Sequence, residues 1–529
     1  MGTYLNPGNS SFMNNCDENY VDKTMLISLI NDTINKSKKM TCVSRPRRFG
    51  KSFAAQMLCA YYDCSCDSHE LFDNLKIAQD ISYETHINKY DVIYIDMTGI
   101  KPYCNDYKTI RSFLVSKLTA ELKAKYPDAV VDDDFPSTLI NVYSISNTKF
   151  IFIIDEWDAP IREAQDNPVI QEQYLEFLRS IFKNSGVTDR VIAAAYMTGI
   201  LPIKKQKGQS AVSAFNEFTV LKPRKFAGYV GFTEEEVQKL CAEHDMDFET
   251  MKRWYDGYSF KGVGSVYNPN SVMQAIENDD FASYWTETSA AEGLMDYISK
   301  DYNGLTKTIA ELIAGIEVEI DPEGFANDLT TFRGKDDVLT LLAHLGYLAY
   351  DADTSTVCIP NEEIRREFQK AVRKVNHTET LNRLKESEQL FADTLAGNEE
   401  AVAAQIEKIH REETASLHYN SENSLRSVIK LAYYTYRDNY VQWEEMPAGD
   451  GFADVAFLPK YDSDYPILVI ELKWKKTAET AIQQIKKRHY PDSFKGYGRN
   501  IILVGITYDK DDKLGERTHI CKIEKVEMK

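Results

Sequence analysis

A Gly-Lys-Ser triplet at residues 50–52 follows a short apolar segment, residues 40–43, and precedes a segment with helical character, residues 53–62. A strand that enters a glycine-containing loop and continues into a helix gathers backbone N–H groups and the helix dipole, which together hold phosphate groups. In such a loop the Lys51 ammonium spans the β- and γ-phosphates and the Ser52 hydroxyl ligates Mg²⁺. This feature predicts an α/β domain that binds a nucleotide.

The loop departs from the usual phosphate-loop pattern, GxxxxGK[ST], because Arg45 stands at the first glycine position. Glycine reaches backbone conformations that other residues adopt only with strain, so the loop is not expected to turn in the usual way. The rest of the loop still suits a nucleotide. The predicted nucleotide-binding residues here are Arg48, Phe49, Gly50, Lys51 and Ser52.

A second chemical signal is a continuous apolar run, residues 150–154, that ends in Asp155 and Glu156. Such a run is typical of a strand buried on both faces of a parallel sheet, and nucleotides bind at the carboxyl edge of such sheets. There Asp155 would hold Mg²⁺ through water and Glu156 would polarise the attacking water. The simpler interpretation is a buried strand capped by two solvated acids. Two motifs in one chain favour the nucleotide site.

Short apolar segments alternate with helical patterns over the first ~220 residues. The segments at 91–96, 150–154 and 191–197 predict an α/β domain with a parallel sheet. The third segment ends at Thr198, from which a hydroxyl can sense the γ-phosphate. Simple capping of the strand end is the alternative role for this residue.

Length and charge limit what the whole chain does. A chain of 529 residues is too long for one hydrophobic core, so about two to four domains are expected. The formal net charge of −19 argues against nonspecific polyanion binding by the whole surface. Residues 405–529 carry as many basic as acidic side chains, however, so a local basic face can still contact nucleic acid.

Residues 1–7 contain neither a basic nor an apolar region, so we expect no secretion signal there, and no stretch approaches the roughly 18 apolar residues of a membrane span. We expect a cytoplasmic protein without a membrane partner, whose nine cysteines are reduced thiols. The cysteines at 59, 64 and 66 with His69 match no common zinc pattern, so packing is favoured over a metal site there.

A second constellation lies near the C-terminus, where two consecutive strands are predicted at residues 451–458 and 467–474. The first carries Asp454. The second carries Glu471 and Lys473, which point to one face because the side-chain period of a strand is two. Asp454 and Glu471 can share Mg²⁺ while Lys473 orients or deprotonates the attacking water, as metal-dependent phosphodiester hydrolysis requires.

A further carboxylate, Glu422 on a helix predicted at residues 422–436, could join this metal site. The alternative is a surface hairpin whose exposed positions happen to be charged. Against it, Glu471 and Lys473 interrupt an otherwise buried run, which costs stability unless that face opens onto a site. The pattern Asp-x(n)-Glu-x-Lys is short and leaves both interpretations open.

Several separated stretches share one further pattern: 20–24 (YVDKT), 45–52 (RPRRFGKS), 255–258 (YDGY), 267–269 (YNP), 271–272 (SV) and 284–285 (YW). Together they resemble the bacterial AAA-ATPase-like proteins that end in a PD-(D/E)XK nuclease-superfamily domain. The resemblance covers nearly the whole chain, and this form of the loop is the family's own variant. One departure is Phe452-Ala453 before Asp454, where the family more often has Gly-Arg or a similar pair.

The resemblance implies roles for individual residues. It carries over Lys51 and Ser52 as nucleotide-binding residues and Asp155 and Glu156 as the acidic motif. It carries over Asp454, Glu471 and Lys473 as the nuclease motif, and Gln484 and Tyr490 as part of the helix that follows this motif. The candidate nucleic-acid contacts are Lys475, Gln484, Lys487 and Tyr490.

The expected fold class is α/β, with four parts along the chain. Residues 234–374 are predicted to be mostly helical and offer no catalytic constellation, and residues 380–413 have the charged helical pattern of a solvated connector. The predicted parts are a P-loop AAA-like ATPase domain with a parallel sheet at 1–225, a helical lid-like or winged-helix-like domain at 226–380, a helical connector at 381–413, and a restriction-endonuclease-like α/β domain at 414–529.

The leading functional hypothesis is an ATPase whose nucleotide state controls a C-terminal Mg²⁺-dependent nuclease that acts on DNA or RNA, in defence or in the handling of mobile elements. One alternative is a nucleotide-dependent signalling or assembly switch whose C-terminal domain binds nucleic acid or protein without cutting. A third is a transposon-associated regulator whose ATPase only assembles homo-oligomers. ATP and Mg²⁺ are the expected cofactors.

Overall fold

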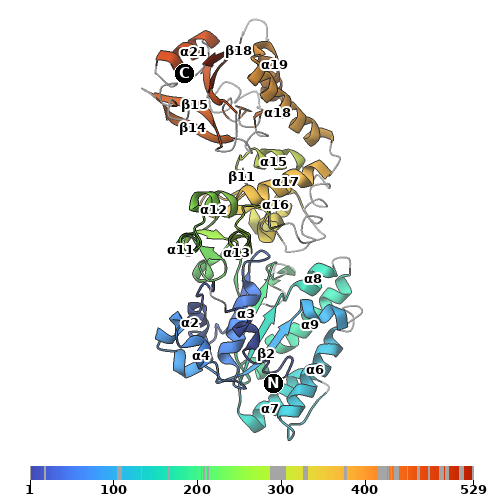
Figure 1. The fold of residues 1–529 in the computed structure, drawn as a ribbon. Coiled ribbons are helices and arrows are strands. Elements are labelled where there is room, and N and C mark those ends of the chain that lie inside the picture. The colour runs from blue at the N-terminus through green and yellow to red at the C-terminus, as the bar shows by residue number, and fades with distance from the viewer. Residues whose placement is uncertain are drawn as a thin grey trace. The chain divides into compact units, whose positions relative to one another are not determined.

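The structure, a computed structural model, divides into two compact units (Figure 1). Unit 1 contains Met1–Leu294 and Glu319–Glu367, and unit 2 contains Met295–Val318 and Phe368–Lys529. The structure describes residues 2–16, 19–103, 110–132, 134–164, 167–203, 205–206, 209–210, 212, 214–285, 305–325, 332–374, 378–413, 426, 428–429, 432–433, 440–448, 451–460, 465–474, 477–487, 494, 500–510 and 517–526.

Unit 1 is built on a parallel sheet with the strand order β2-β3-β4-β1-β7. The strands predicted at 91–96, 150–154 and 191–197 are confirmed as its members. Because β4 lies between β1 and β3, the ends of these three strands meet at one edge. The strands are β1 (Met40–Ser44), β2 (Asp91–Asp96), β3 (Phe150–Asp155), β4 (Ile192–Gly199) and β7 (Asn216–Phe218).

Helices cover both faces of this sheet (Figure 1). On one face, leucines at four-residue spacing in α6 join residues of α7 and α9 in a single core with β3. On the other face, α3 packs against β3 and β4. These helices are α3 (Lys51–Tyr62), α6 (Ile110–Lys125), α7 (Phe135–Ser146) and α9 (Pro168–Phe182).

Short elements complete the α/β part of unit 1 and its connections. Most are single helical turns, which position loops rather than form a layer of their own. They are α1 (Ser10–Met13), α2 (Met25–Asn31), α4 (His69–Phe72), η1 (Lys76–Gln79), α5 (Tyr83–His86), η2 (Thr98–Tyr103), α8 (Ala159–Glu163), α10 (Ser185–Thr188), β5 (Lys205–Gln206), β6 (Gln209–Ser210) and η4 (Arg224–Phe226).

The middle of the chain is less helical than its sequence predicts. Helices are present, and Thr233 and Glu236 begin the first of them with a reciprocal capping box. Short strands that the prediction lacks form a sheet of order β8-β10-β9 and a β12-β13 hairpin. The elements are β8 (Phe232–Thr233), α11 (Glu234–Glu243), α12 (Phe248–Tyr255), β9 (Tyr258–Phe260), β10 (Gly264–Tyr267), α13 (Pro269–Asn278), α15 (Leu305–Ile313), β11 (Val318–Glu319), η6 (Pro322–Gly324), α16 (Lys335–Leu345), β12 (Ala349–Asp351), β13 (Thr356–Cys358) and α17 (Glu362–Lys374).

Unit 2 contains a mixed sheet with the strand order β14-β15-β16-β17-β18, in which β16 and β17 are parallel and the other neighbours are antiparallel. The crossover between the two parallel strands contains α21 (Ala478–Lys487). The strands are β14 (Tyr440–Ala448), β15 (Gly451–Pro459), β16 (Ile467–Trp474), β17 (Ile501–Lys510) and β18 (Arg517–Val526). The two strands predicted to carry the nuclease motif, β15 and β16, are therefore neighbours.

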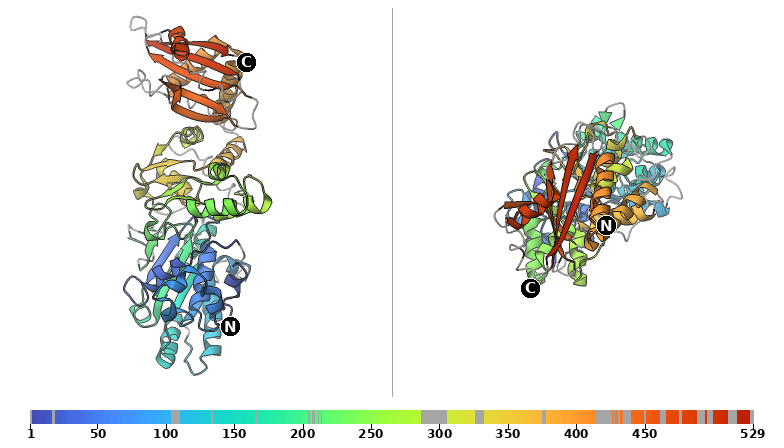
Figure 2. Two further views of the ribbon diagram at one scale, coloured as in Figure 1. Left: turned by 60° about the vertical axis from the view of Figure 1, so that its left-hand side comes forward. Right: turned by 90° about the horizontal axis from the view of Figure 1, so that it is seen from above.

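Helices lie on both faces of this sheet, with α18 and α19 on one face and α21 on the other (Figure 2). Helices α18 (Thr378–Ala396) and α19 (Glu399–Glu413) confirm the helical prediction for residues 380–413. The prediction that these helices form a solvated connector is wrong, because Leu390, Val402 and Ile406 are buried in a core with the sheet. No helix in the described part of the chain is long and apolar enough to cross a membrane.

Candidate active sites

The predicted phosphate loop connects β1 to α3, and Gly50 is the N-cap residue that directly precedes α3. Gly50 has a φ of 84°, in the left-handed region that favours glycine, and Arg48 has a φ of 67° there as well. A Cβ atom added to Gly50 would meet nothing within 4 Å. The loop therefore faces open space at the N-terminus of a 12-residue helix, an arrangement that fits a phosphate group.

Arg45 explains why this loop tolerates the loss of its first glycine. The side chain is fully buried, and its guanidinium donates hydrogen bonds to the carbonyl oxygens of Phe218 (3.1 Å) and Phe226 (3.2 Å). It also lies over the Phe260 ring, 5.2 Å from the centroid, and burial lowers the pKa of Arg45 to about 10. Arg45 thus ties the loop to β7, η4 and β9.

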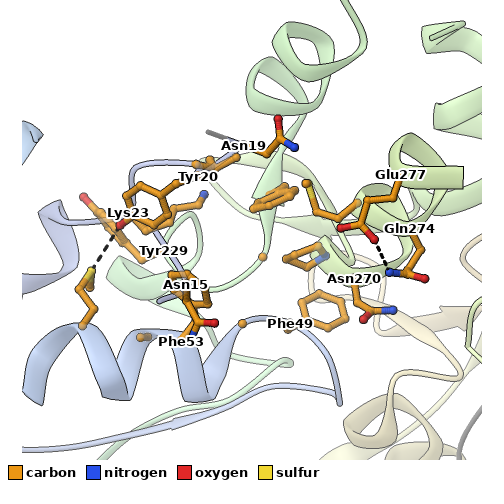
Figure 3. Close-up of a pocket in the computed structure, with 18 residues that line it drawn as sticks. Asn15, Asn19, Tyr20, Lys23, Phe49, Phe53, Tyr229, Asn270, Gln274 and Glu277 are labelled. Carbon is orange, nitrogen blue, oxygen red and sulfur yellow. Dashed lines mark hydrogen bonds between the residues drawn. The ribbon is translucent and has the colours of Figure 1, made fainter. Parts of the chain in front are cut away.

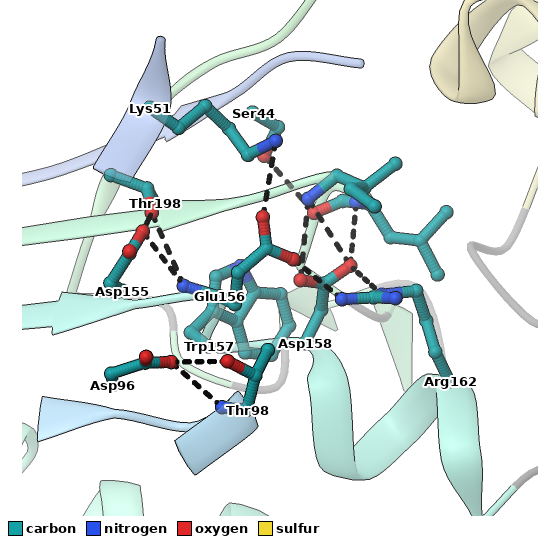
Figure 4. Close-up of polar contacts among 12 residues, drawn as sticks. Ser44, Lys51, Asp96, Thr98, Asp155, Glu156, Trp157, Asp158, Arg162 and Thr198 are labelled. Atoms are coloured by element: carbon teal, nitrogen blue, oxygen red, sulfur yellow. Dashed lines mark hydrogen bonds and ion pairs between the residues drawn. The ribbon is translucent and has the colours of Figure 1, made fainter. Parts of the chain in front are cut away.

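Lys51 and Glu156 form the centre of a charged network at the edge of the sheet (Figure 4). The Lys51 ammonium donates to the Pro46 carbonyl oxygen at 2.9 Å and lies 3.1 Å from a Glu156 carboxylate oxygen. The second Glu156 oxygen accepts a hydrogen bond from Arg162 at 2.5 Å. Glu156 therefore lies between two cations.

Asp158 fixes the position of Arg162. Its carboxylate is fully buried and accepts hydrogen bonds from the backbone N–H groups of Ile200 (3.2 Å) and Leu201 (2.8 Å). The same carboxylate accepts from the Arg162 guanidinium at 3.0 Å, one helical turn along α8 (Figure 4). Because backbone amides fix Asp158, the position of Arg162 against Glu156 is fixed as well.

Asp155 and Glu156 are neighbours in sequence, but their pKa values shift in opposite directions. Asp155 is 2% exposed, and burial raises its pKa despite hydrogen bonds from the hydroxyls of Ser52 and Thr198. Burial alone would also raise the pKa of Glu156, but the charges of Lys51 and Arg162 outweigh it and lower that pKa. Glu156 has a φ of 50°, which turns the chain sharply after β3.

Thr198 lies within this site, at the end of β4. Its hydroxyl donates to Asp155 and accepts the Glu156 backbone N–H at 3.2 Å (Figure 4). These contacts hold the two acidic residues in register. A contact between Thr198 and a γ-phosphate stays a prediction.

A cavity of about 450 Å³ lies beside the loop and contains Gly50 in its wall (Figure 3). Aromatic rings line it, and those of Tyr20 and Phe53 stack with centroids 5.8 Å apart. The side-chain amides of Asn15 and Asn270 line it too. Flat apolar walls with amide groups suit a nucleobase. Residues of three stretches that carry the family resemblance, 20–24, 45–52 and 267–269, line this cavity.

The ligand set of unit 1 fits Mg²⁺ bound together with phosphates. Among the described residues, no group of three His, Cys, Asp or Glu side chains could hold a metal ion. Mg²⁺ is usually held by one or two protein ligands plus phosphate oxygens and water. Ser52, an exposed hydroxyl, and Asp155, which it contacts, provide such a pair.

The nuclease motif forms a second cluster, on β15, β16 and α21. Asp454 accepts a hydrogen bond from the Leu472 backbone N–H at 2.8 Å, so its carboxylate lies against β16. Glu471 is 1% exposed and accepts from Lys473 at 2.7 Å and from the Gln484 side chain. The structure thus brings the motif residues to neighbouring positions on two strands, with Gln484 beside them. Two carboxylates on adjacent strands suit a divalent cation.

Sequence analysis missed one residue of this cluster and predicted others whose position is not described. The Arg426 guanidinium lies 3.6 Å from the Asp454 carboxylate, a contact that no local sequence signal announces. Lys487 is exposed in the last turn of α21. Three predicted residues lie outside the described part of the chain: Glu422, Lys475 and Tyr490.

Two family profiles match the chain. Residues 8–207 match the profile of a predicted AAA-ATPase, and residues 420–516 match that of the PD-(D/E)XK nuclease superfamily. The chain therefore combines an AAA-ATPase-like region with a PD-(D/E)XK nuclease-superfamily region. The first region contains the Lys51–Glu156 network, and the second contains the Asp454–Glu471 cluster.

The relatives that match this chain are distant. An uncharacterized protein in the vnfD 5' region of Azotobacter chroococcum is 20% identical over 515 residues, which is 94% of each chain. Among solved structures, the Walker-type ATPase of Pyrococcus abyssi is 11% identical, with a TM-score of 0.33 over 66% of this chain and 94% of that one. The ORC2 protein of Aeropyrum pernix is 12% identical, with a TM-score of 0.29 over 70% and 99%.

Proposed function

We propose that this protein binds and hydrolyses ATP in unit 1, cleaves nucleic acid with Mg²⁺ in unit 2, and uses its nucleotide state to control cleavage. The observation that carries the first part is the contact of Lys51 with Glu156 beside an open loop. The second part rests on the Asp454, Glu471 and Lys473 cluster in the nuclease-superfamily region.

In unit 1 the triphosphate would lie along the loop and the base in the cavity that Gly50 borders. Phosphate oxygens would replace Glu156 as the partner of the Lys51 ammonium, because both are anions competing for one cation. Glu156 would keep its contact with Arg162, which holds it ionised as the group that polarises the attacking water. Ser52 and Asp155 would hold Mg²⁺, which neutralises charge on the phosphates.

In unit 2, Asp454 and Glu471 would hold Mg²⁺, which activates water and polarises the scissile phosphate when bound. Lys473 lies 2.7 Å from Glu471, close enough to orient the attacking water or to stabilise negative charge on the phosphate. Gln484 keeps Glu471 in place through its hydrogen bond. Arg426 is a second cation that a phosphate would contact beside Asp454.

The test is to incubate the purified full chain with plasmid, linear and single-stranded DNA and with RNA, with and without ATP and with Mg²⁺ or Mn²⁺. We expect ATP hydrolysis, metal-dependent cleavage of at least one substrate, and a cleavage rate that changes when ATP is added. A chain that hydrolyses ATP but cuts nothing under any of these conditions contradicts the nuclease assignment. A cleavage rate indifferent to nucleotide contradicts the control.

A further inference from the structure

The edge strand β14 displays two large apolar side chains to solvent. Val441 is 40% exposed and Trp443 is 50% exposed. Three other tryptophans of the chain, Trp157, Trp254 and Trp285, are at most 5% exposed. An indole left half in water forfeits part of the free energy that burial provides, so its exposure needs a reason.

The strand register places Val441 and Trp443 on one face of the sheet. They pair with Leu458 and Ala456 of β15. Tyr440, the residue before them, packs its ring 5.4 Å from that of Phe391 in α18, on the opposite face. Because side chains alternate along a strand, Val441 and Trp443 lie on the face that α18 and α19 do not cover.

The nuclease cluster lies on this same face. Ala456, the partner of Trp443, pairs in turn with Val469 of β16, and Glu471 follows Val469 by two residues. Glu471 contacts Gln484 of α21, and α21 packs on β16, β17 and β18. The face is therefore covered by α21 on one side of the cluster, while β14 carries the exposed Trp443 on the other.

We propose that Trp443 stacks against an unpaired base of the nucleic-acid substrate, next to the phosphate that the nuclease cluster engages, with Val441 extending the apolar contact. This inference rests on the proposed nuclease function. A flat ring binds any base through its π-face, so stacking supplies affinity without sequence preference. In a duplex, the neighbouring base pairs cover both faces of each base, so only a single strand or a frayed end offers a free face to the indole.

Positive charge near the nuclease cluster agrees with this partner. Lys473 and Arg426 lie beside the two carboxylates, and Lys487 is exposed on α21. A sugar-phosphate backbone that crosses the cluster would meet these cations while its neighbouring base reaches β14.

The experiment measures binding of a short fluorescent single-stranded DNA to the full chain with Ca²⁺ in place of Mg²⁺, which slows cleavage. We expect Trp443→Ala to raise Kd about tenfold, the scale of one base–aromatic stack, and Trp443→Phe to raise it much less. The same oligonucleotide without bases should bind wild type and Trp443→Ala equally. Ile145→Ala, which removes a 53% exposed side chain of unit 1, should leave Kd unchanged.

Each other result overturns the inference. If Trp443→Ala leaves Kd unchanged while wild type binds and cleaves, stacking is wrong and the nuclease function stands. If wild type neither binds nor cleaves any nucleic acid, both fail. If sedimentation shows a dimer that Trp443→Ala dissociates, with Kd for DNA unchanged, β14 is an interface between two copies of this chain instead.

Discussion

The ATPase-like site of unit 1 and the nuclease-like site of unit 2 both bring carboxylates together, but they hold them by different means. In unit 1, backbone amides fix Asp158, hydroxyls hold Asp155, and two cations flank Glu156. In unit 2, Asp454 accepts a backbone N–H of the next strand, and Glu471 accepts from side chains on its own strand and on α21.

The two sites therefore differ in how far their carboxylates are positioned by protein contacts alone. In unit 1 a chain of contacts runs from backbone amides through Asp158 and Arg162 to Glu156, so the carboxylate that we propose to polarise water is held in position before a ligand binds. In unit 2 the two acids lie on neighbouring strands, each with one cationic side chain nearby, and a shared divalent cation would join them. We therefore expect that single substitutions in unit 1 affect ATP binding and hydrolysis to different degrees. In unit 2 we expect that removal of either carboxylate abolishes cleavage.

The largest effect is expected in unit 2. Asp454→Ala or Glu471→Ala removes one of two metal-binding carboxylates, so Mg²⁺-dependent cleavage should fall to background. ATP hydrolysis should persist, because the two sites belong to separate units. Cleavage gels and phosphate release on the same preparations measure both activities. Glu479→Ala, at an exposed position of α21, is the matched control and should cut normally.

Unit 1 should respond in two separable ways. Lys51→Ala removes the cation that the phosphates require, so ATP affinity should be largely lost. Glu156→Gln should keep or raise ATP affinity, because Glu156 competes with the phosphates for Lys51, and it should slow hydrolysis by about 10²- to 10⁴-fold, because polarisation of water is lost. Equilibrium binding of a fluorescent ATP analogue and single-turnover hydrolysis distinguish the two. Normal turnover by Glu156→Gln would move the polarising role to another residue.

The long strands and both motifs are predictable from sequence because each has a continuous local signal. Apolar runs lead into Asp155 and Glu471, and their ends mark the sites. The three-residue strands of the middle part have no such period. Tertiary contacts determine the structure of this part of the chain, as Gly257 shows. It has a φ of 113°, and an added Cβ would lie 2.0 Å from the Pro360 carbonyl oxygen. That constraint comes from a distant part of the chain.

The partners of the site residues are harder to predict for the same reason. Arg162 lies on a five-residue helix, and only the tertiary fold brings Leu201 and Asp158 together to fix it. Arg426 reaches Asp454 from outside the two predicted strands, and Asn270 joins a cavity near residue 15. The domain limits at residues 225, 380 and 413 stay predictions.

A smaller effect is expected when the positioning chain of unit 1 is cut at Arg162. Arg162→Ala removes one of the cations that lower the pKa of Glu156, so that pKa rises. The acid limb of the pH–rate profile should move to higher pH, and the rate at neutral pH should fall about tenfold. Arg162→Lys should return the acid limb of the profile toward its wild-type pH but recover less of the rate. A lysine keeps the positive charge, but it cannot contact Asp158 and Glu156 at once as the guanidinium does. A profile unchanged in Arg162→Ala would contradict the positioning role.

The smallest effect concerns stability, where the two neighbouring acids should act in opposite directions. Folding raises the pKa of Asp155, so its contribution to stability declines as pH rises from its ordinary pKa through the raised one. Asp155→Asn should therefore stabilise the protein at neutral pH by about 1 kcal/mol, while abolishing hydrolysis.

Folding lowers the pKa of Glu156. Its contribution to stability is full above its ordinary pKa and is lost as pH falls through the lowered one. Glu156→Gln should destabilise by about 2 kcal/mol at neutral pH, because Lys51 and Arg162 lose a charged partner. Thermal unfolding of both variants at neutral and acidic pH measures this contrast, and shifts of equal sign at neutral pH would contradict it.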